Sequence, residues 1–331
     1  MGASPHIVVA GAGAIGCFVG GLLAARGKRV TLLGRARIFD ELRRDGLSLS
    51  DFADFSVHIP RETLNLSEDA ACLSEADIVL VTVKSTATAS VAAEIAAHAK
   101  STAYIVSLQN GMGNERILRA ALPQNDIRAG MVPFNIVPKG QGRFHRATSG
   151  DIVIGAGPGM LEQVLSTPDL TVIARDDIAS VQWGKLLVNL ANALNALSGQ
   201  PLRSQLMSRD WRVLMADQMA EGLAVLRAHG IVPVSTTPLP ANMTPHILRL
   251  PTWAFTRIAA KMMTIDPQAR ASMAFDLEAG RPTEVDAMQG EFIRLAKKAN
   301  LKVPICESVL KAVKAAERGG PQTLDPKTLT P

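Results

Sequence analysis

A glycine-rich turn between a strand and a helix is the feature that most constrains this chain. Residues 7–10 form a short apolar run typical of a buried parallel strand. Gly11, Gly13 and Gly16 follow with the spacing G-x-G-x-x-G, and an apolar helical pattern comes directly after them. A second strand is expected at residues 29–33. This strand–turn–helix–strand context predicts an α/β dinucleotide-binding domain more strongly than the motif would alone.

Each part of the turn has a separate expected role. Gly11 allows the tight turn, Gly13 lets a pyrophosphate approach the backbone, and Gly16 lets the helix pack closely on the strand. The helix N-terminus, with Ala14 and Ile15 beside Gly16, is expected to face the anion. The alternative is a glycine-rich turn that binds no ligand.

The end of the second strand indicates which dinucleotide is bound. An NAD site usually has Asp or Glu at this position to bind the ribose 2′-hydroxyl. This chain has Leu-Leu-Gly-Arg-Ala-Arg at residues 32–37, and the first acid is Asp40. The guanidinium of Arg35 matches the geometry of a 2′-phosphate, and Arg37 is a second candidate. We therefore predict NADP(H) over NAD(H), unless both arginines are only solvated surface charges.

Composition limits the class of protein. The chain has 331 residues, enough for two domains, with 47% apolar residues and a net charge of +5. The basic residues are spread and aromatic residues are few, so nucleic-acid binding is disfavoured. No apolar run reaches the length of a membrane span, so no membrane association is expected. Three isolated cysteines predict reduced thiols, a cytoplasmic location and no metal site.

The hydrophobic pattern divides the chain into two domains. Residues 1–176 read as the α/β domain, and residues 177–331 read as an all-α domain with helical periodicity. Strands are expected at 77–83 and 103–108, followed directly by polar clusters that contain Lys84 and Asn110. Ligands bind at the carboxyl ends of parallel strands, so both residues are in position to contact one. The alternatives are that Lys84 is an ordinary surface lysine and that Asn110 only forms part of a tight turn.

Three segments after the second of these strands are predicted to be antiparallel strands that close the first domain. They lie at residues 127–137, 142–145 and 151–154, and glycine-rich turns separate them.

The first long helix of the second half contains candidate catalytic residues. Lys185 and Asn189 are four residues apart and so share one helix face. Lys185 lies among apolar residues, where a lysine either reaches water or is partly buried for a purpose. Asn192 and Asn195 are best explained by hydrogen bonds between helices, and Asn189 less so.

A second candidate group lies near residues 271–286. Ser272 and Asp276 are expected on one helix face, and Gly280 to Pro282 ends that helix. Thr283 is the predicted N-cap of the next helix, with Asp286 as its capping-box partner. Glu284 either stabilises this helix N-terminus by its charge or faces Lys185 and orients it.

Taken in order, these motifs make the chain resemble the ketopantoate reductase (2-dehydropantoate 2-reductase) family, in its longer-chain subgroup. The resemblance covers nearly the whole length. The matching residues are Gly11, Gly13, Gly16, Lys84, Gln109 to Gly113, Lys185, Asn189, Ser272, Asp276, and Gly280 to Glu284 with Asp286.

The resemblance implies an N-terminal Rossmann domain, an all-helical C-terminal domain, NADPH, and reduction of a small-molecule 2-keto acid to a 2-hydroxy acid in pantothenate biosynthesis. It implies that Lys185 is the general acid and Glu284 its partner. Lys84 and Asn110 border the cofactor and the substrate, and Asn189 and Ser272 bind the substrate. Asp276 is interpreted as structural.

Two departures from the compact members of the family concern the substrate. The segment over residues 232–265 is longer, and Ala193 and Ala269 stand where compact members tend to have asparagine. Alternatives are another 2-keto acid reductase, a 3-hydroxyacid dehydrogenase, or a non-catalytic NADPH-sensing protein. The apolar helix expected over 214–226 covers either the core or a homodimer interface.

Overall fold

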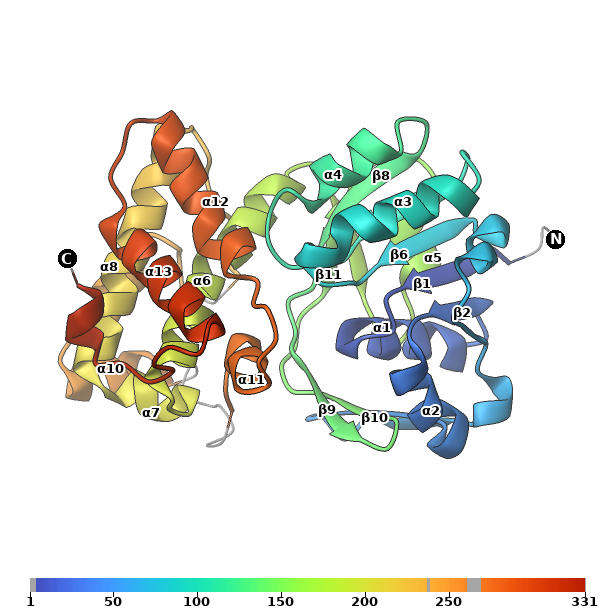
Figure 1. The fold of residues 1–331 in the computed structure, drawn as a ribbon, viewed down its shortest axis with the longest axis horizontal. Coiled ribbons are helices and arrows are strands. Elements are labelled where there is room, and N and C mark those ends of the chain that lie inside the picture. The colour runs from blue at the N-terminus through green and yellow to red at the C-terminus, as the bar shows by residue number, and fades with distance from the viewer. Residues whose placement is uncertain (1–3, 237–238, 261–268, 331) are drawn as a thin grey trace. The chain divides into compact units, whose positions relative to one another are not determined.

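The computed structural model describes residues 4–236, 239–260 and 269–330. It divides into two compact units, Met1–Ala179 and Ser180–Pro331. The first unit contains strands and helices, and the described part of the second is helical, as predicted (Figure 1).

The first unit is built on an eight-stranded sheet in the order β12-β11-β8-β7-β6-β1-β2-β5. The strands are β1 (Ile7–Ala10), β2 (Val30–Leu33), β5 (Leu66–Ser67), β6 (Ile78–Val81), β7 (Tyr104–Ser107), β8 (Asp126–Met131), β11 (Ile152–Gly155) and β12 (Val172–Arg175). β1 pairs in parallel with both β2 and β6, and β6 pairs in parallel with β7. The carboxyl ends of these four strands therefore lie along one edge of the sheet, where ligands bind in such folds.

Successive side chains of β1 point to opposite faces of the sheet, and each face contributes to a different apolar core. Ile7 and Val9 face a core shared with α1, whereas Val8 and Ala10 face a core shared with α3 and α4. Figure 1 shows α3 and α4 together on one side of β6. The helices of this unit are α1 (Ala14–Ala25), α2 (Ala36–Asp45), α3 (Thr88–His98), α4 (Asn114–Ala121) and α5 (Leu161–Leu165), with 3-10 turns η1 (Arg61–Thr63), η2 (Ala70–Glu75) and η3 (Ser85–Ala87).

The prediction of three antiparallel strands closing this domain is only partly correct. The segment 127–137 is two strands, because Pro133 follows β8 and the chain then enters a different sheet. β8 pairs in parallel with β7 and antiparallel with β11, while β11 continues in parallel to β12. The second sheet, in the order β4-β3-β10-β9, contains β3 (Leu47–Asp51), β4 (Ser56–Ile59), β9 (Ile136–Gly140) and β10 (Arg143–Arg146).

The second unit is organised around one long helix, α6 (Ile178–Ser198). α12 packs on it through Trp183 and Phe292, whose rings meet edge to face at 5.4 Å, and through Gln289, which donates to the Leu190 carbonyl at 3.0 Å. The other helices are α7 (Leu202–Met207), α8 (Arg209–Ala228), α9 (Thr244–Leu248), α10 (Thr252–Ile258), α11 (Ser272–Glu278), α12 (Val285–Lys298), α13 (Pro304–Glu317) and the 3-10 turn η5 (Pro326–Leu329).

The longer segment predicted over 232–265 falls partly outside the described residues, at 237–238 and 261–265. Its described part contains α9 and α10. Arg212 of α8 anchors this region, because its fully buried guanidinium donates hydrogen bonds to the carbonyls of Leu248 and Leu250.

Candidate active site

The turn after β1 requires glycine at two positions for steric reasons. Gly11 has φ +116°, and a Cβ atom there would lie 2.8 Å from the backbone nitrogen of Val83. A Cβ atom on Gly16 would lie 2.1 Å from the Gly11 carbonyl oxygen and 2.7 Å from the Thr82 hydroxyl. The first turn of α1 therefore packs directly on the ends of β1 and β6.

Gly13 is different, because a Cβ atom built on it meets nothing within 4 Å. Gly13 is the N-cap residue of α1, whose start has no side-chain cap and no acidic residue in its first turn. The N–H groups of Ala14 and Ile15 belong to this first turn, where an α-helix offers donors without internal partners. The backbone thus presents donors beside open space, which suits an anion.

Arg35 lies immediately beyond β2, at the N-cap position of α2. Both Arg35 and Arg37 are exposed, and within the described residues neither side chain has a hydrogen bond or ion pair. Asp40, the first acid after the strand, is exposed and lies 3.8 Å from Arg43. The residues directly after β2 therefore offer guanidinium groups to a ligand, and the first acid that follows them along the chain is Asp40.

A buried polar network joins the ends of β6 and β7. Gln109 donates to the Val83 carbonyl at 3.0 Å and to the Thr88 hydroxyl at 2.8 Å. Thr88 in turn donates to Asn114 at 2.8 Å. Gln109, Thr88 and Asn114 are all almost fully buried, so each bond is costly to lose.

This network fixes the two turns that contain Lys84 and Asn110. The Asn110 carbonyl accepts the Ser85 hydroxyl at 2.8 Å and the Asn114 amide at 2.9 Å. Both Lys84 and Asn110 are exposed, so their side chains lie at the surface of a rigid polar support. Sequence reasoning noted the cluster but did not identify Gln109, Thr88 and Asn114 as its buried supports.

Lys185 and Asn189 lie one turn apart on α6. Lys185 is half-buried among core residues, and burial lowers the pKa of its ammonium group. Asn189 is 7% exposed, and within the described residues its side chain makes no hydrogen bond, but its amide atoms are not among the enclosed polar atoms that lack a partner. The amide therefore keeps some exposure and can form a hydrogen bond with a small molecule one helical turn from Lys185.

A segment that sequence reasoning did not connect to α6 packs beside Lys185. The Val234 nitrogen donates to the Ser180 carbonyl at 3.0 Å. A Cβ atom on Gly184 would lie only 1.7 Å from the Val234 carbonyl oxygen. Glycine in a helix interior costs about 1 kcal/mol of stability relative to alanine. The close approach of Val234 explains why glycine nevertheless occupies position 184. The beginning of the longer segment thus covers α6 one residue before Lys185.

Ser272 is the first residue of α11 and is exposed. The preceding residue is anchored to α6, because the Ala271 nitrogen donates to the Asn195 side chain at 2.8 Å. Asn195 also donates to the Gln205 side chain at 3.0 Å, in agreement with the inter-helix role predicted for it. Asn192 has no such bond within the described residues. Asp276 is buried and accepts from Arg281 at 3.1 Å.

Glu284, which is half-buried, is the N-cap residue of α12, so the N-cap predicted at Thr283 is one residue too early, and the predicted capping box is also wrong. Thr283 does accept the Val285 N–H, at 3.3 Å, but Asp286 is not its capping-box partner. The carboxylate that accepts the Thr283 N–H belongs to Glu317 of α13, at 2.8 Å. Asp286 instead pairs with Lys314 at 2.6 Å. Tertiary packing between α12 and α13 replaces the local motif.

The predicted site residues thus form two groups. The glycine turn, Arg35, Lys84 and Asn110 lie at the carboxyl ends of strands in the first unit, and Lys185, Asn189, Ser272 and Glu284 lie on or beside three helices of the second. Within the described residues no three His, Cys, Asp or Glu side chains gather as a metal site. In that same part of the chain, no helix has the length and apolar character needed to cross a membrane.

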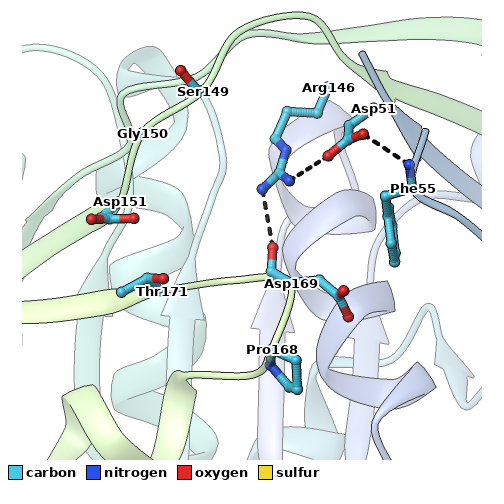
Figure 2. A pocket seen from close by; sticks show the side chains of 9 residues that line it. All are labelled: Asp51, Phe55, Arg146, Ser149, Gly150, Asp151, Pro168, Asp169 and Thr171. Carbon is cyan, nitrogen blue, oxygen red and sulfur yellow. Dashed lines mark hydrogen bonds and ion pairs between the residues drawn. The ribbon is translucent and has the colours of Figure 1, made fainter. Parts of the chain in front are cut away.

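A pocket of about 370 Å³ lies elsewhere in the first unit and contains none of the predicted residues (Figure 2). Asp51, whose side chain is 4% exposed, accepts from Arg146 at 2.6 Å, and Arg146 also donates to the Asp169 carbonyl at 3.1 Å. The lining residues are Asp51, Phe55, Arg146, Ser149, Gly150, Asp151, Pro168, Asp169 and Thr171. The guanidinium lies 5.6 Å from the Phe18 ring, so this pair has a structural role in the core.

Replacing Asp51 with asparagine should destabilise the protein by about 2–3 kcal/mol, because the Arg146 side chain, which is only 16% exposed, would lose its charge partner. Burial alone raises the pKa of Asp51, but the bonds from Arg146 and the N–H groups of Ala53 and Phe55 outweigh it and lower the pKa. A lowered pKa stabilises the fold above the unfolded value of about 4 and loses that effect as pH falls further. Thermal melts from neutral to acid pH should therefore show a weaker acid dependence in Asp51→Asn.

The matched control is Asp169→Asn in the same pocket. Its carboxylate pairs with Arg26, which is 43% exposed, so the expected loss is below about 1 kcal/mol. Equal losses in the two variants would contradict the structural role of the Asp51–Arg146 pair.

The parallel sheet, its glycine turn and the helical unit that follows define the class of protein: an N-terminal Rossmann domain followed by an all-α domain. Comparison with known families agrees and is more specific. The family model described as "Ketopantoate reductase PanE/ApbA" matches residues 7–159, and its C-terminal counterpart matches residues 177–317. The chain belongs to the ketopantoate reductase family.

Relatives and solved structures are similar along nearly the full length. A 2-dehydropantoate 2-reductase of Halobacterium salinarum is 26% identical, over 95% of this chain and 100% of its own. The crystal structure of a PanE/ApbA family ketopantoate reductase from Ralstonia eutropha has a TM-score of 0.81 and 28% identity, covering 95% and 99% of the two chains. A D-mandelate dehydrogenase in complex with NADH and anilino(oxo)acetate has a TM-score of 0.79, 21% identity and the same coverage, and so shares the fold.

Proposed function

We propose that this chain catalyses the NADPH-dependent reduction of a 2-keto acid to a 2-hydroxy acid. The first substrate to test is 2-dehydropantoate (ketopantoate), whose product, pantoate, serves pantothenate biosynthesis. The main support is the combination of a dinucleotide turn with a half-buried lysine and, one turn along α6, an asparagine whose amide makes no hydrogen bond within the described residues. Family membership supports the reaction type.

The residues present fit a dinucleotide. The open space at Gly13 and the uncapped start of α1 suit a pyrophosphate, and the exposed guanidinium of Arg35 suits a 2′-phosphate. Lys84 and Asn110 are proposed to contact the cofactor and the substrate. When bound, the nicotinamide supplies the hydride.

The residues of the second unit handle the substrate. Reduction of a ketone leaves negative charge on its oxygen, so a cation that can also donate a proton is required there. Lys185 is proposed to be this general acid, and Glu284 to orient its ammonium group. Asn189 and Ser272 are proposed to hydrogen-bond the carboxylate or hydroxyl of the substrate.

The experiment that tests this function is a substrate panel in which turnover is measured as the loss of NADPH absorbance. The panel contains ketopantoate, benzoylformate (the keto acid that corresponds to mandelate) and smaller 2-keto acids, with 3-hydroxy acids and NADP⁺ tested in the oxidation direction. Turnover of ketopantoate supports the full proposal, and turnover of another 2-keto acid keeps the mechanism but changes the substrate. Oxidation of only 3-hydroxy acids, or NADPH binding without turnover, would contradict it.

Cofactor preference is predicted to depend on Arg35. Arg35→Ala should reduce kcat/KM with NADPH about 10- to 100-fold and leave kcat/KM with NADH unchanged. A loss of this size corresponds to the free energy of one charge-assisted hydrogen bond to phosphate. Arg37→Ala is the matched control, with a smaller expected effect. Both variants are compared with each cofactor at saturating keto acid, and an equal loss with NADPH and NADH would contradict the role of Arg35.

The assembly state and the location in the cell stay predictions. A homodimer is tested by size-exclusion chromatography with light scattering, and a cytoplasmic location by fractionation of cells that express the protein.

A further inference from the structure

We propose that Glu317, the last residue of α13, is a positioning residue that fixes the backbone at Glu284 through Thr283. This inference rests on the proposed role of Glu284 in the reaction. Glu317 lies 34 residues from Thr283 in the sequence, so the link is visible only in the folded chain.

The contacts surround Glu284 on both sides. One oxygen of Glu317, Oε1, accepts the Thr283 N–H at 2.8 Å and the Thr283 hydroxyl proton at 2.7 Å. The Thr283 hydroxyl oxygen then accepts the Val285 N–H at 3.3 Å. Thr283, before Glu284, is therefore hydrogen-bonded directly to the Glu317 carboxylate, and Val285, after it, is linked to the same carboxylate through the Thr283 hydroxyl.

The rest of the network keeps that carboxylate ionised and in place. Oε2 of Glu317 pairs with Lys314 at 3.1 Å, and Lys314 also pairs with Asp286 at 2.6 Å. Burial alone raises the pKa of Glu317, but the bonds from Thr283 and Lys314 outweigh it and the pKa is lowered. Thr283 is only 2% exposed, so water does not readily replace the carboxylate as acceptor.

The N-terminus of α12 is capped without the side chain of Glu284. Glu284 occupies the N-cap position but makes no capping hydrogen bond with its side chain. Residues at N-caps usually use their side chain for this bond. Here the Thr283 hydroxyl accepts the Val285 N–H instead, and Glu317 accepts the Thr283 N–H.

The test measures kcat and KM for four variants with the substrate and cofactor that the panel identifies. Glu317→Ala should lower kcat about 10- to 100-fold, since a displacement near 1 Å of a catalytic group can cost that much, and should leave KM for NADPH unchanged. Glu317→Gln keeps an acceptor for Thr283 and should recover most of the loss. Glu284→Gln should lower kcat by itself, and adding Glu317→Ala to it should cause no further loss.

Amide hydrogen exchange in the full-length protein provides a readout without turnover. Exchange in the peptide spanning Thr283 to Val285 should rise in Glu317→Ala and stay low in Asp286→Asn. The latter variant removes a partner of Lys314 without touching Thr283, and should keep wild-type kcat. If Glu317→Ala does not fold, the same comparison is made with Thr283→Val.

The outcomes separate this inference from the proposed function. Additive losses in the double variant, or unchanged exchange at Thr283, would overturn the link through Glu317 while the role of Glu284 stands. Wild-type kcat in Glu284→Gln would overturn both.

Discussion

Replacing Lys185 with methionine should lower kcat for the keto acid about 10²- to 10⁴-fold, the usual contribution of a general acid. Methionine fills the same half-buried space on α6, but its side chain is uncharged and has no acidic proton to donate. The affinity for NADPH should stay near that of the wild type, because the proposed cofactor residues all lie in the first unit. Steady-state kinetics with the best substrate, together with NADPH fluorescence titration, measures both quantities.

The pH profile provides a second measure of the same group. A general acid acts in its protonated form, so kcat should fall as pH rises through the pKa of Lys185. Burial lowers that pKa, and the alkaline limb should therefore lie below the ordinary lysine value of 10.5. In Lys185→Met this limb should be absent.

Lys185→Arg separates the two duties of the lysine. Arginine keeps a positive charge but holds its proton at all accessible pH values. It should restore little activity if proton donation is the larger contribution, and much of it if charge alone stabilises the developing oxyanion. Wild-type kcat in Lys185→Met would remove Lys185 from the mechanism.

The parts of the fold and site that were predictable are those set by local sequence. The glycine turn, the buried strands and the pairing of Lys185 with Asn189 on one helix face depend on residues within a few positions of each other. The steric needs of Gly11 and Gly16 follow from the same short stretch. Such features are strongly determined by backbone geometry and hydrophobic period.

The supports of the site were not predictable, because their partners are distant in sequence. Gln109 reaches Val83, 26 residues away, and no periodic pattern marks a buried amide. Glycine inside the α6 pattern at position 184 was an available signal, but only the fold shows that Val234 packs against it. The local capping rule failed at Asp286, because Lys314 from α13 pairs with that carboxylate.

The same added methyl group at Gly13 and at Gly16 should weaken NADPH binding in both cases but should destabilise the fold only at Gly16. Gly16→Ala places a Cβ atom 2.1 Å from the Gly11 carbonyl, which is backbone and cannot move aside cheaply. We expect a loss of about 3 kcal/mol in the free energy of unfolding, at the upper end of overpacking costs, together with loss of NADPH binding. Urea unfolding and fluorescence titration measure the two effects.

Gly13→Ala should keep the fold and lose the cofactor. Its φ of −84° is open to alanine and no atom lies within 4 Å of the new methyl group, so the stability change should be within about 1 kcal/mol. The methyl group would occupy the space proposed for the pyrophosphate, and the Kd for NADPH should rise about 10- to 100-fold, the equivalent of 1–3 kcal/mol of overpacking. A Gly13→Ala protein that binds NADPH as tightly as the wild type would show that the phosphates lie elsewhere. The contrast with Gly16 separates a glycine required by the fold from one required by the ligand.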